Sequence, residues 1–173
     1  MHRIGPPAQI LTLALAFAAG CDVGATPATP PIVAGRANAP REVNLIAKDY
    51  SFLPPIVDLV PGETILLHVV NGGLEVHEAV IGDARVQAAW ESAEAATLGA
   101  PPGPTPVVSV APDLAGIRIV VRSGERVDIV WTVPTDPPDL WVGCHIPGHF
   151  DRGMQVPIRF VPPGSSPADV PTP

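Results

Sequence analysis

The chain has 173 residues, of which 46% are hydrophobic and 16% are charged, a balance typical of a globular domain and unlike a charge-rich disordered chain. Its formal net charge of −7 argues against a nucleic-acid partner, because binding to phosphates requires clustered Lys and Arg. The two ends differ in composition from the middle, which is long enough to bury a core. We expect one folded domain between two segments of another kind.

The first twenty residues have the pattern of an export signal, and we expect residues 1–20 to be a signal peptide. Arg3 precedes an apolar run that is too short to span a bilayer, and small residues lead up to Cys21. This end of the chain resembles a bacterial lipoprotein signal, which implies that Cys21 is lipidated. Ala18 stands where that pattern usually has Leu, so cleavage nearby with loss of Cys21 stays open. Lipidation of Cys21 would leave Cys144 without a disulfide partner.

Two segments lack the large apolar residues that a core needs. Residues 21–40 are rich in Ala, Thr, Pro and Gly, and we expect a linker that tethers the domain to a membrane. Residues 163–173 are rich in Pro, and we expect a disordered tail. The folded domain is therefore predicted to cover residues 41–162.

Short apolar runs separated by Pro, Gly, Asn or Asp turns fill most of this domain. One strong turn, Asn71-Gly72-Gly73, leads into a run that contains His77. No strand alternates with a long helix, which disfavours a parallel βαβ sheet. The spacing predicts an all-β sandwich or barrel. The predicted strands are residues 42–48, 56–60, 64–70, 76–81, 107–111, 117–121, 126–133, 140–143 and 155–161.

Residues 83–99 interrupt the β pattern with apolar side chains at helical spacing. Asp83 can cap the start of a helix and Gly99 its end. We expect one inserted helix lying over the sandwich, with Trp90 covering one end of the core. A partner-docking element is the alternative. The predicted buried stripe is Val86, Ala89, Trp90, Ala93 and Ala96.

The stretch WVGCHIPGHFDRGM, residues 141–154, contains a thiol, two imidazoles and a thioether. Such soft ligands favour copper, and two His and one Cys with a weak axial Met describe an electron-transfer copper centre. Cys144 and His145 are adjacent on extended chain, so their side chains point to opposite faces. His149 can return toward Cys144 after a turn, and the flexible Met154 can reach an axial position. The fourth ligand, a second histidine, must come from elsewhere.

This stretch resembles the ligand loop of the cupredoxins, the blue copper proteins, and its Cys-x4-His-x4-Met spacing is most similar to rusticyanin-like and auracyanin-like members. Residues 48–82 resemble the first half of that family's domain, where strands lead through a Pro-Gly turn and an Asn-containing turn to the first histidine ligand. The resemblance implies a Greek-key β-sandwich. It also implies one copper ion, alternating between Cu(I) and Cu(II), with the ligands His77, Cys144, His149 and Met154.

Other candidate ligands are weaker. His145 beside Cys144 is similar to the Cys-His pair of multicopper oxidases, but such an enzyme needs several more histidines than the five present here. Glu78, beside His77, is an alternative ligand or an acceptor of a hydrogen bond in the surrounding shell. His68 is interpreted as a structural histidine.

The resemblance implies a monomeric one-electron carrier outside the cytoplasmic membrane, and not an enzyme. Ile146, Pro147 and Phe150 are expected to form an apolar docking patch around an exposed edge of His149. The partner would be a redox protein such as a cytochrome or an oxidase, with a basic surface attracted to the acidic chain. A protein of copper handling or resistance, without electron transfer, is the alternative. A metal-free immunoglobulin-like lipoprotein is a third reading.

Overall fold

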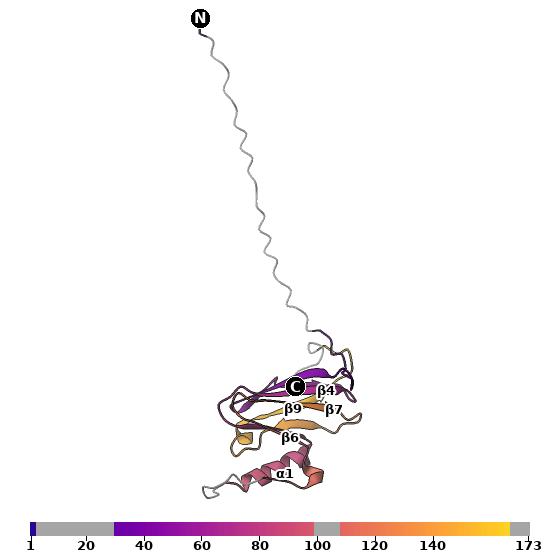
Figure 1. The fold of residues 1–173 in the computed structure, drawn as a ribbon, viewed down its shortest axis with the longest axis vertical. Helices are drawn as coiled ribbons and strands as arrows, with labels where there is room; N and C mark the ends of the chain where they lie inside the picture. Colours follow the sequence, from indigo (N-terminus) through magenta and orange to yellow (C-terminus); the bar gives the residue numbers. More distant parts are fainter. Residues whose placement is uncertain (3–29, 99–107, 167–173) are drawn as a thin grey trace.

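The computed structural model describes residues 1–2, 30–98 and 108–166, and in this part of the chain two β-sheets and one α-helix are stacked (Figure 1). One sheet has four strands in the order β2-β1-β4-β7, and the other has five in the order β3-β9-β8-β5-β6. The expected all-β sandwich with one inserted helix is confirmed. The strands are β1 Arg41–Lys48, β2 Ser51–Leu53, β3 Val57–Leu59, β4 Thr64–Asn71, β5 His77–Gly82, β6 Ile117–Val121, β7 Arg126–Thr132, β8 Leu140–Gly143 and β9 Gln155–Phe160.

The core lies between the two sheets. Strand β1 alternates buried and more exposed residues, because one of its faces packs on the core and the other faces solvent. Strand β5 is buried along its whole length, because the sandwich core covers one face and α1 the other. The main cluster includes Leu45, Ala47, Ile65, Leu67, Val69, Ala79, Ile81, Val121, Val142 and Ile158. Burial of each Val, Leu or Ile side chain in this cluster contributes roughly 1.5–3 kcal/mol.

The register between β5 and β8 positions the ligand loop. These strands are antiparallel, and Val80 lies opposite Gly143, the last residue of β8. Continuing this register places Cys144 opposite Ala79 and carries the following loop toward His77, the first residue of β5. Two distant segments of the sequence therefore meet at one end of the five-stranded sheet.

Helix α1, Ala84–Ala95, covers the outer face of this sheet, on the side opposite the sheet that contains β4 and β7 (Figure 1). The Asp83 side chain caps it as predicted, accepting the N–H groups of Arg85 and Val86 at 3.0 Å each. The helix ends earlier than expected, at a cap formed by Ala96, while Gly99 lies outside the described residues.

The buried face of α1 differs from the predicted stripe. Val86 and Trp90 are buried as expected, but Ala89 and Ala93 are only half-buried and Ala96 is exposed, while Gln87 and Glu94 are buried instead. Both polar side chains find partners on the sheet, which a pattern of apolar residues does not indicate. The predicted strand at residues 107–111 is absent from its described part, 108–111, because Val108 and Val110 pack against the α1 cluster instead.

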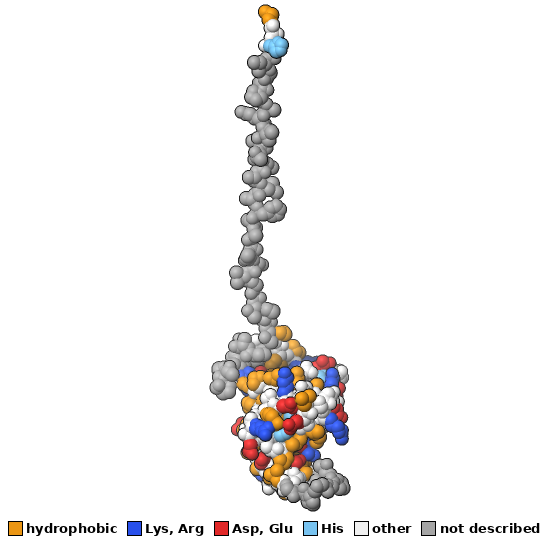
Figure 2. Space-filling model, turned by 90° about the vertical axis from the view of Figure 1, so that its left-hand side faces the viewer, with side chains coloured by type: hydrophobic (Ala, Val, Ile, Leu, Met, Phe, Trp, Pro, Cys, Tyr) orange, Lys and Arg blue, Asp and Glu red, His pale blue; other side chains and the backbone are white. Residues whose placement is uncertain are grey.

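Part of the predicted linker is bonded to the domain. Ile32 donates its N–H to the carbonyl of Ser165 at 2.8 Å and accepts that of Gly164 at 2.8 Å, and Thr64 donates to Gly35 at 3.1 Å. Cys21 and residues 167–173 lie outside the described residues. Among the described helices, none is long and apolar enough to cross a membrane. Acidic, basic and apolar side chains are interspersed on the face that Figure 2 shows.

Candidate metal centre

Three of the four predicted ligands converge in the structure. One donor atom each of His77, Cys144 and His149 lies within 4.8 Å of the others. The Nδ1 atoms of the two histidines are 3.2 Å apart, and Sγ of Cys144 is 3.4 Å from Nδ1 of His149. All three side chains are buried. This is the geometry of a small enclosed site with two nitrogen donors and one sulfur donor.

The thiol of Cys144 needs a cation to ionise. Burial raises its pKa to about 12, although the N–H of Glu78 points at Sγ from 3.5 Å and opposes this rise. A buried thiolate therefore requires a positive charge beside it. A metal ion between the sulfur and the two Nδ1 atoms would supply that charge.

Hydrogen bonds on the far side of each histidine ring determine which nitrogen faces the site. Nε2 of His77 lies 3.1 Å from Oδ1 of Asp49, and Nε2 of His149 lies 3.0 Å from Oε2 of Glu75. The bond with His77 lowers the pKa of Asp49, and bonds from Tyr50 and then His149 lower the pKa of Glu75. An ionised carboxylate only accepts hydrogen bonds, so a neutral ring at either position places its hydrogen on Nε2 and its lone pair on Nδ1.

The donor set therefore fits a soft metal ion. Burial lowers the pKa of His149, which favours the neutral ring that a metal ligand must have. Two imidazole nitrogens and one cysteine sulfur, all buried, are the donor set that an electron-transfer copper site would use. No other residue type at these three positions would supply the same donors.

Met154 lies at the base of the ligand loop and is fully buried. Its carbonyl accepts the N–H of Cys144 at 3.0 Å, and its own N–H donates to the carbonyl of His149 at 3.2 Å. Gly153 just before it has a φ of 89°, a left-handed conformation that glycine adopts without strain. The backbone thus ties Met154 to both loop ligands, and its role as the axial ligand stays a prediction.

His145 faces away from the cluster, as the alternation of adjacent side chains predicted. Its Nε2 lies 2.7 Å from Oε1 of Gln87 and its Nδ1 lies 2.8 Å from Oε2 of Glu91, both on α1. Its ring stacks on Phe150 with 4.8 Å between centroids. Both ring nitrogens are engaged, so His145 anchors the loop to the helix.

Glu78 braces the same loop and does not join the cluster. Its Oε1 accepts the N–H of His145 at 3.0 Å, and its Oε2 accepts from Nε of Arg118 at 2.6 Å. The buried carboxylate of Glu78 is therefore paired with Arg118, which also donates to Glu94 at 2.9 Å. Of its two predicted roles, the structure supports hydrogen-bond acceptor.

The prediction of an exposed edge on His149 is wrong. His149 is only 4% exposed, because Glu75 occupies its outer nitrogen and the ring of Tyr50 stands edge-on to it at 5.2 Å. Tyr50 has a φ of 68°, which turns its ring over the histidine, and the guanidinium of Arg152 lies 4.1 Å from the ring centre of Tyr50. Sequence reasoning missed these covering residues, and the only available signal was the nearness of Glu75 to His77.

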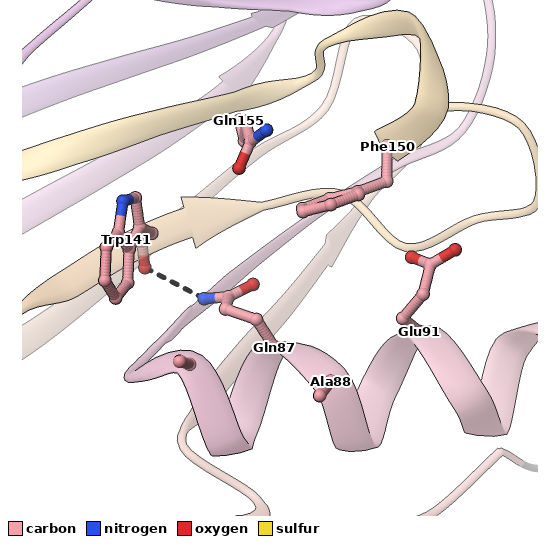
Figure 3. Close-up of a pocket in the computed structure, with 7 residues that line it drawn as sticks. Gln87, Ala88, Glu91, Trp141, Phe150 and Gln155 are labelled. Carbon is pink, nitrogen blue, oxygen red and sulfur yellow. Dashed lines mark hydrogen bonds between the residues drawn. The ribbon is translucent and has the colours of Figure 1, made fainter.

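The residues predicted as a docking patch, Ile146, Pro147 and Phe150, are half-buried. Phe150 also borders a pocket of about 320 Å³ between α1 and the loop, and Figure 3 shows its ring above the helix. In the same view the side chain of Gln87 points to the carbonyl of Trp141. None of the converging metal donors lines this pocket, whose lining residues are Ala84, Gln87, Ala88, Glu91, Trp141, Phe150 and Gln155.

Comparison with curated proteins gives one relative that spans most of this chain. It is the copper-resistant cuproprotein CopI of Pseudomonas aeruginosa, 27% identical over 170 residues, a match that covers 86% of this chain and 92% of the relative. No family model matches the chain.

Among solved structures, three auracyanins have similar folds. Auracyanin B has a TM-score of 0.53 at 22% identity, covering 78% of this chain and 96% of its own. Auracyanin A, a "blue" copper protein from Chloroflexus aurantiacus, has a TM-score of 0.53 at 18% identity, with coverage of 71% and 100%. Reduced auracyanin from Roseiflexus castenholzii has a TM-score of 0.52 at 19% identity, with coverage of 70% and 97%. The chain therefore has the cupredoxin fold, and its buried His-Cys-His cluster fits a type 1 copper site.

Proposed function

We propose that this chain binds one copper ion through His77, Cys144 and His149, with Met154 as a weak axial ligand, and carries single electrons. The observation that supports this most is the convergence of three buried soft-metal donors within 4.8 Å. Bound copper would supply one-electron chemistry by alternating between Cu(I) and Cu(II).

The residues around the donors favour a copper ion that stays bound over one that is transferred to another protein. His77 lies on β5, an interior strand of the five-stranded sheet, and hydrogen bonds to Asp49 and Glu75 orient the two rings. The N–H of Glu78 points at the sulfur of Cys144. A ligand set held in this way would change little between Cu(I) and Cu(II), which suits a one-electron carrier.

The place of action is proposed from the ends of the chain. Residues 1–20 support export, and a lipid on Cys21 would hold the protein at the outer face of the cytoplasmic membrane. A cytochrome or an oxidase would dock at Ile146, Pro147 and Phe150 in a small, short-lived interface. The chain would act as a monomer and not as an enzyme.

A second function, copper resistance without electron transfer, is favoured by the relative CopI, which is named for copper resistance and matches most of this chain. The two functions share a copper site. They differ in whether the site passes electrons to and from another protein.

The visible spectrum of the copper-loaded chain tests the site. We expect intense absorption from the bond between Cys144 and copper, lost together with most of the copper in Cys144→Ser. The matched control is His68→Gln, which alters a buried histidine outside the cluster and should keep the colour. Equal copper content in Cys144→Ser and the unsubstituted chain would contradict the proposed site.

Electrochemistry then separates the two functions. Fast, reversible oxidation and reduction of the loaded chain is the result that we expect of a carrier. A colourless chain that holds copper only as Cu(I) would exclude the carrier and leave the resistance function.

A further inference from the structure

We infer that Asp49 and Glu75 are positioning residues of the copper centre that also favour Cu(II) over Cu(I). Each carboxylate holds the outer N–H of one ligand ring, Asp49 that of His77 and Glu75 that of His149. This inference rests on the proposed function, because it concerns the same site. It assigns a role to two residues that no sequence motif indicated.

The contacts connect buried donors with a charged surface. The side chains of His77 and His149 are 0% and 5% exposed, whereas those of Asp49 and Glu75 are 35% and 51% exposed. Each ring therefore lies between a carboxylate at the surface and the enclosed donor cluster. Because each outer nitrogen carries its hydrogen toward a carboxylate, both Nδ1 lone pairs point at the same small space.

The turn before β5 is built to hold Asp49. The N–H of Leu74 donates to both carboxylate oxygens, at 3.0 and 3.2 Å, and the N–H of Glu75 lies 3.3 Å from Oδ1. A Cβ on Gly73 would lie 2.3 Å from Oδ1 of Asp49, so only glycine allows this approach. The side chain of Asn71 fixes the turn, accepting the N–H of Gly73 at 2.8 Å and donating to the carbonyl of Glu75 at 2.7 Å.

A second device holds Glu75. The hydroxyl of Tyr50 donates to Oε1 at 2.8 Å, which leaves Oε2 for His149. Tyr50 adopts a φ of 68°, a left-handed conformation that is uncommon for a residue other than glycine and that clusters at functional sites. This conformation places the Tyr50 ring against His149 and its hydroxyl at Glu75 in one arrangement.

The electronic consequence follows from the charge. A carboxylate that accepts the outer N–H of an imidazole raises the basicity of the opposite nitrogen. The more basic ligand stabilises the doubly charged ion more than the singly charged one, because the attraction grows with the charge of the ion. Two such pairs therefore lower the reduction potential of the centre.

The variants Asp49→Asn and Glu75→Gln test this inference in the copper-loaded full chain. Both keep the size of the side chain and an acceptor oxygen while removing the charge. We expect the affinity for Cu(II) to fall about 10–100-fold in each, with a smaller fall for Cu(I). Each tenfold fall in the affinity for Cu(II) relative to that for Cu(I) raises the reduction potential by about 59 mV.

Glu42→Gln is the matched control. It removes the same charge from an exposed position at the start of β1. Glu42 precedes Asp49 by seven residues, or roughly 23 Å of extended strand. That distance is well beyond the screening length at physiological salt. The control should leave the potential unchanged. If Asp49→Asn and Glu75→Gln both match the control, the inference is wrong.

A second measurement works on the metal-free chain. Nitrogen NMR of the histidine rings should find the hydrogen of His77 and His149 on Nε2, and Asp49→Ala and Glu75→Ala should shift it toward Nδ1. Finding it on Nδ1 in the unsubstituted chain would overturn the inference even where copper binds. A chain that binds no copper would overturn the proposed function, and the NMR result would still decide which group orients the rings.

Discussion

Nε2 of His145 lies 2.7 Å from Oε1 of Gln87, and this contact joins the inserted helix to the residue that follows Cys144. The amide of Gln87 is oriented unambiguously, because its own nitrogen lies 3.1 to 3.2 Å from the carbonyls of Val80, Gly82 and Trp141. Its oxygen must then accept from His145. One side chain of α1 therefore connects strands β5 and β8 with the ligand loop.

Gln87→Leu should destabilise the protein although it makes the helix more apolar. The substitution leaves the buried N–H of His145 without an acceptor, which costs about 1–3 kcal/mol. Urea unfolding followed by tryptophan fluorescence would measure the loss. Ser92→Ala, on the exposed face of the same helix, should change the free energy of unfolding by less than about 0.5 kcal/mol. Equal stability of the two variants would refute the anchoring role.

Gly143→Ala should disturb the same contact from the strand side. A Cβ at this position would lie 2.5 Å from Oε1 of Gln87, 3.0 Å from Nε2 of His145 and 3.2 Å from the ring of Phe150. We expect a loss of about 1–3 kcal/mol from overpacking, together with a changed visible spectrum, because Cys144 is the next residue.

Gly124→Ala is the control for Gly143→Ala. Gly124 has a φ of 75° with open space around it, so alanine there costs about 1–2 kcal/mol of backbone strain without any clash. Its visible spectrum should stay unchanged. If Gly143→Ala lowers stability but also keeps the spectrum, the contact between α1 and the loop does not shape the site.

The sequence was sufficient to predict that His77, Cys144 and His149 converge on one site. Their side-chain types are those of one soft-metal site, and the loop spacing and the turn before His77 limit which residues can meet. The resemblance to cupredoxins indicated the strand from which the missing histidine comes. The structure then brought the three donors within 4.8 Å.

The partners of these ligands could not be predicted in the same way. The contact of Asp49 with His77 depends on a turn conformation, and the position of Glu75 depends on the left-handed backbone of Tyr50. Neither has a periodic signal in the sequence. Gln87 and Glu94 were missed for a related reason, because helical patterns count apolar residues and these polar side chains are buried by their hydrogen bonds.

Asp128→Asn tests a pair of neighbouring strands away from the metal centre. Hydrogen bonds from Arg126 and then from His68 lower the pKa of Asp128 to about 2. A carboxyl group whose pKa is lower in the folded chain stabilises it above the unfolded pKa, about 3.9, and this contribution disappears as the pH falls through about 2. The stability difference between the chain and the variant should therefore be constant above about pH 5 and vanish near pH 2.

Asp113→Asn is the comparison for that pH series. Asp113 and Arg85 are 73% and 74% exposed and 3.8 Å apart, a pair that contributes little. Unfolding measured from about pH 2 to 6 should give the same curve for Asp113→Asn and for the unsubstituted chain. A difference for Asp128→Asn that persists at the acid end would show that the carboxylate charge is not its cause.

Glu63→Gln should destabilise the protein by breaking a buried ion pair outside the metal centre. Glu63 is buried and accepts from Arg41 at 2.5 and 2.9 Å, from Val60 at 2.8 Å and from Gly35 at 3.2 Å. Burial alone would raise its pKa, but these bonds hold it below the usual value. We expect a loss of about 3 kcal/mol, the low end for a broken buried pair, because Arg41 is partly exposed. Since the folded pKa of Glu63 is lowered, the stability deficit of the variant should be full at neutral pH and shrink as the pH falls below about 4.

Glu42→Gln is the control, because Glu42 is exposed and follows Arg41 in the chain. It should lose less than about 0.5 kcal/mol in the same denaturant titration. A similarly small loss for Glu63→Gln would show that the pair of Glu63 and Arg41 does not stabilise the sandwich.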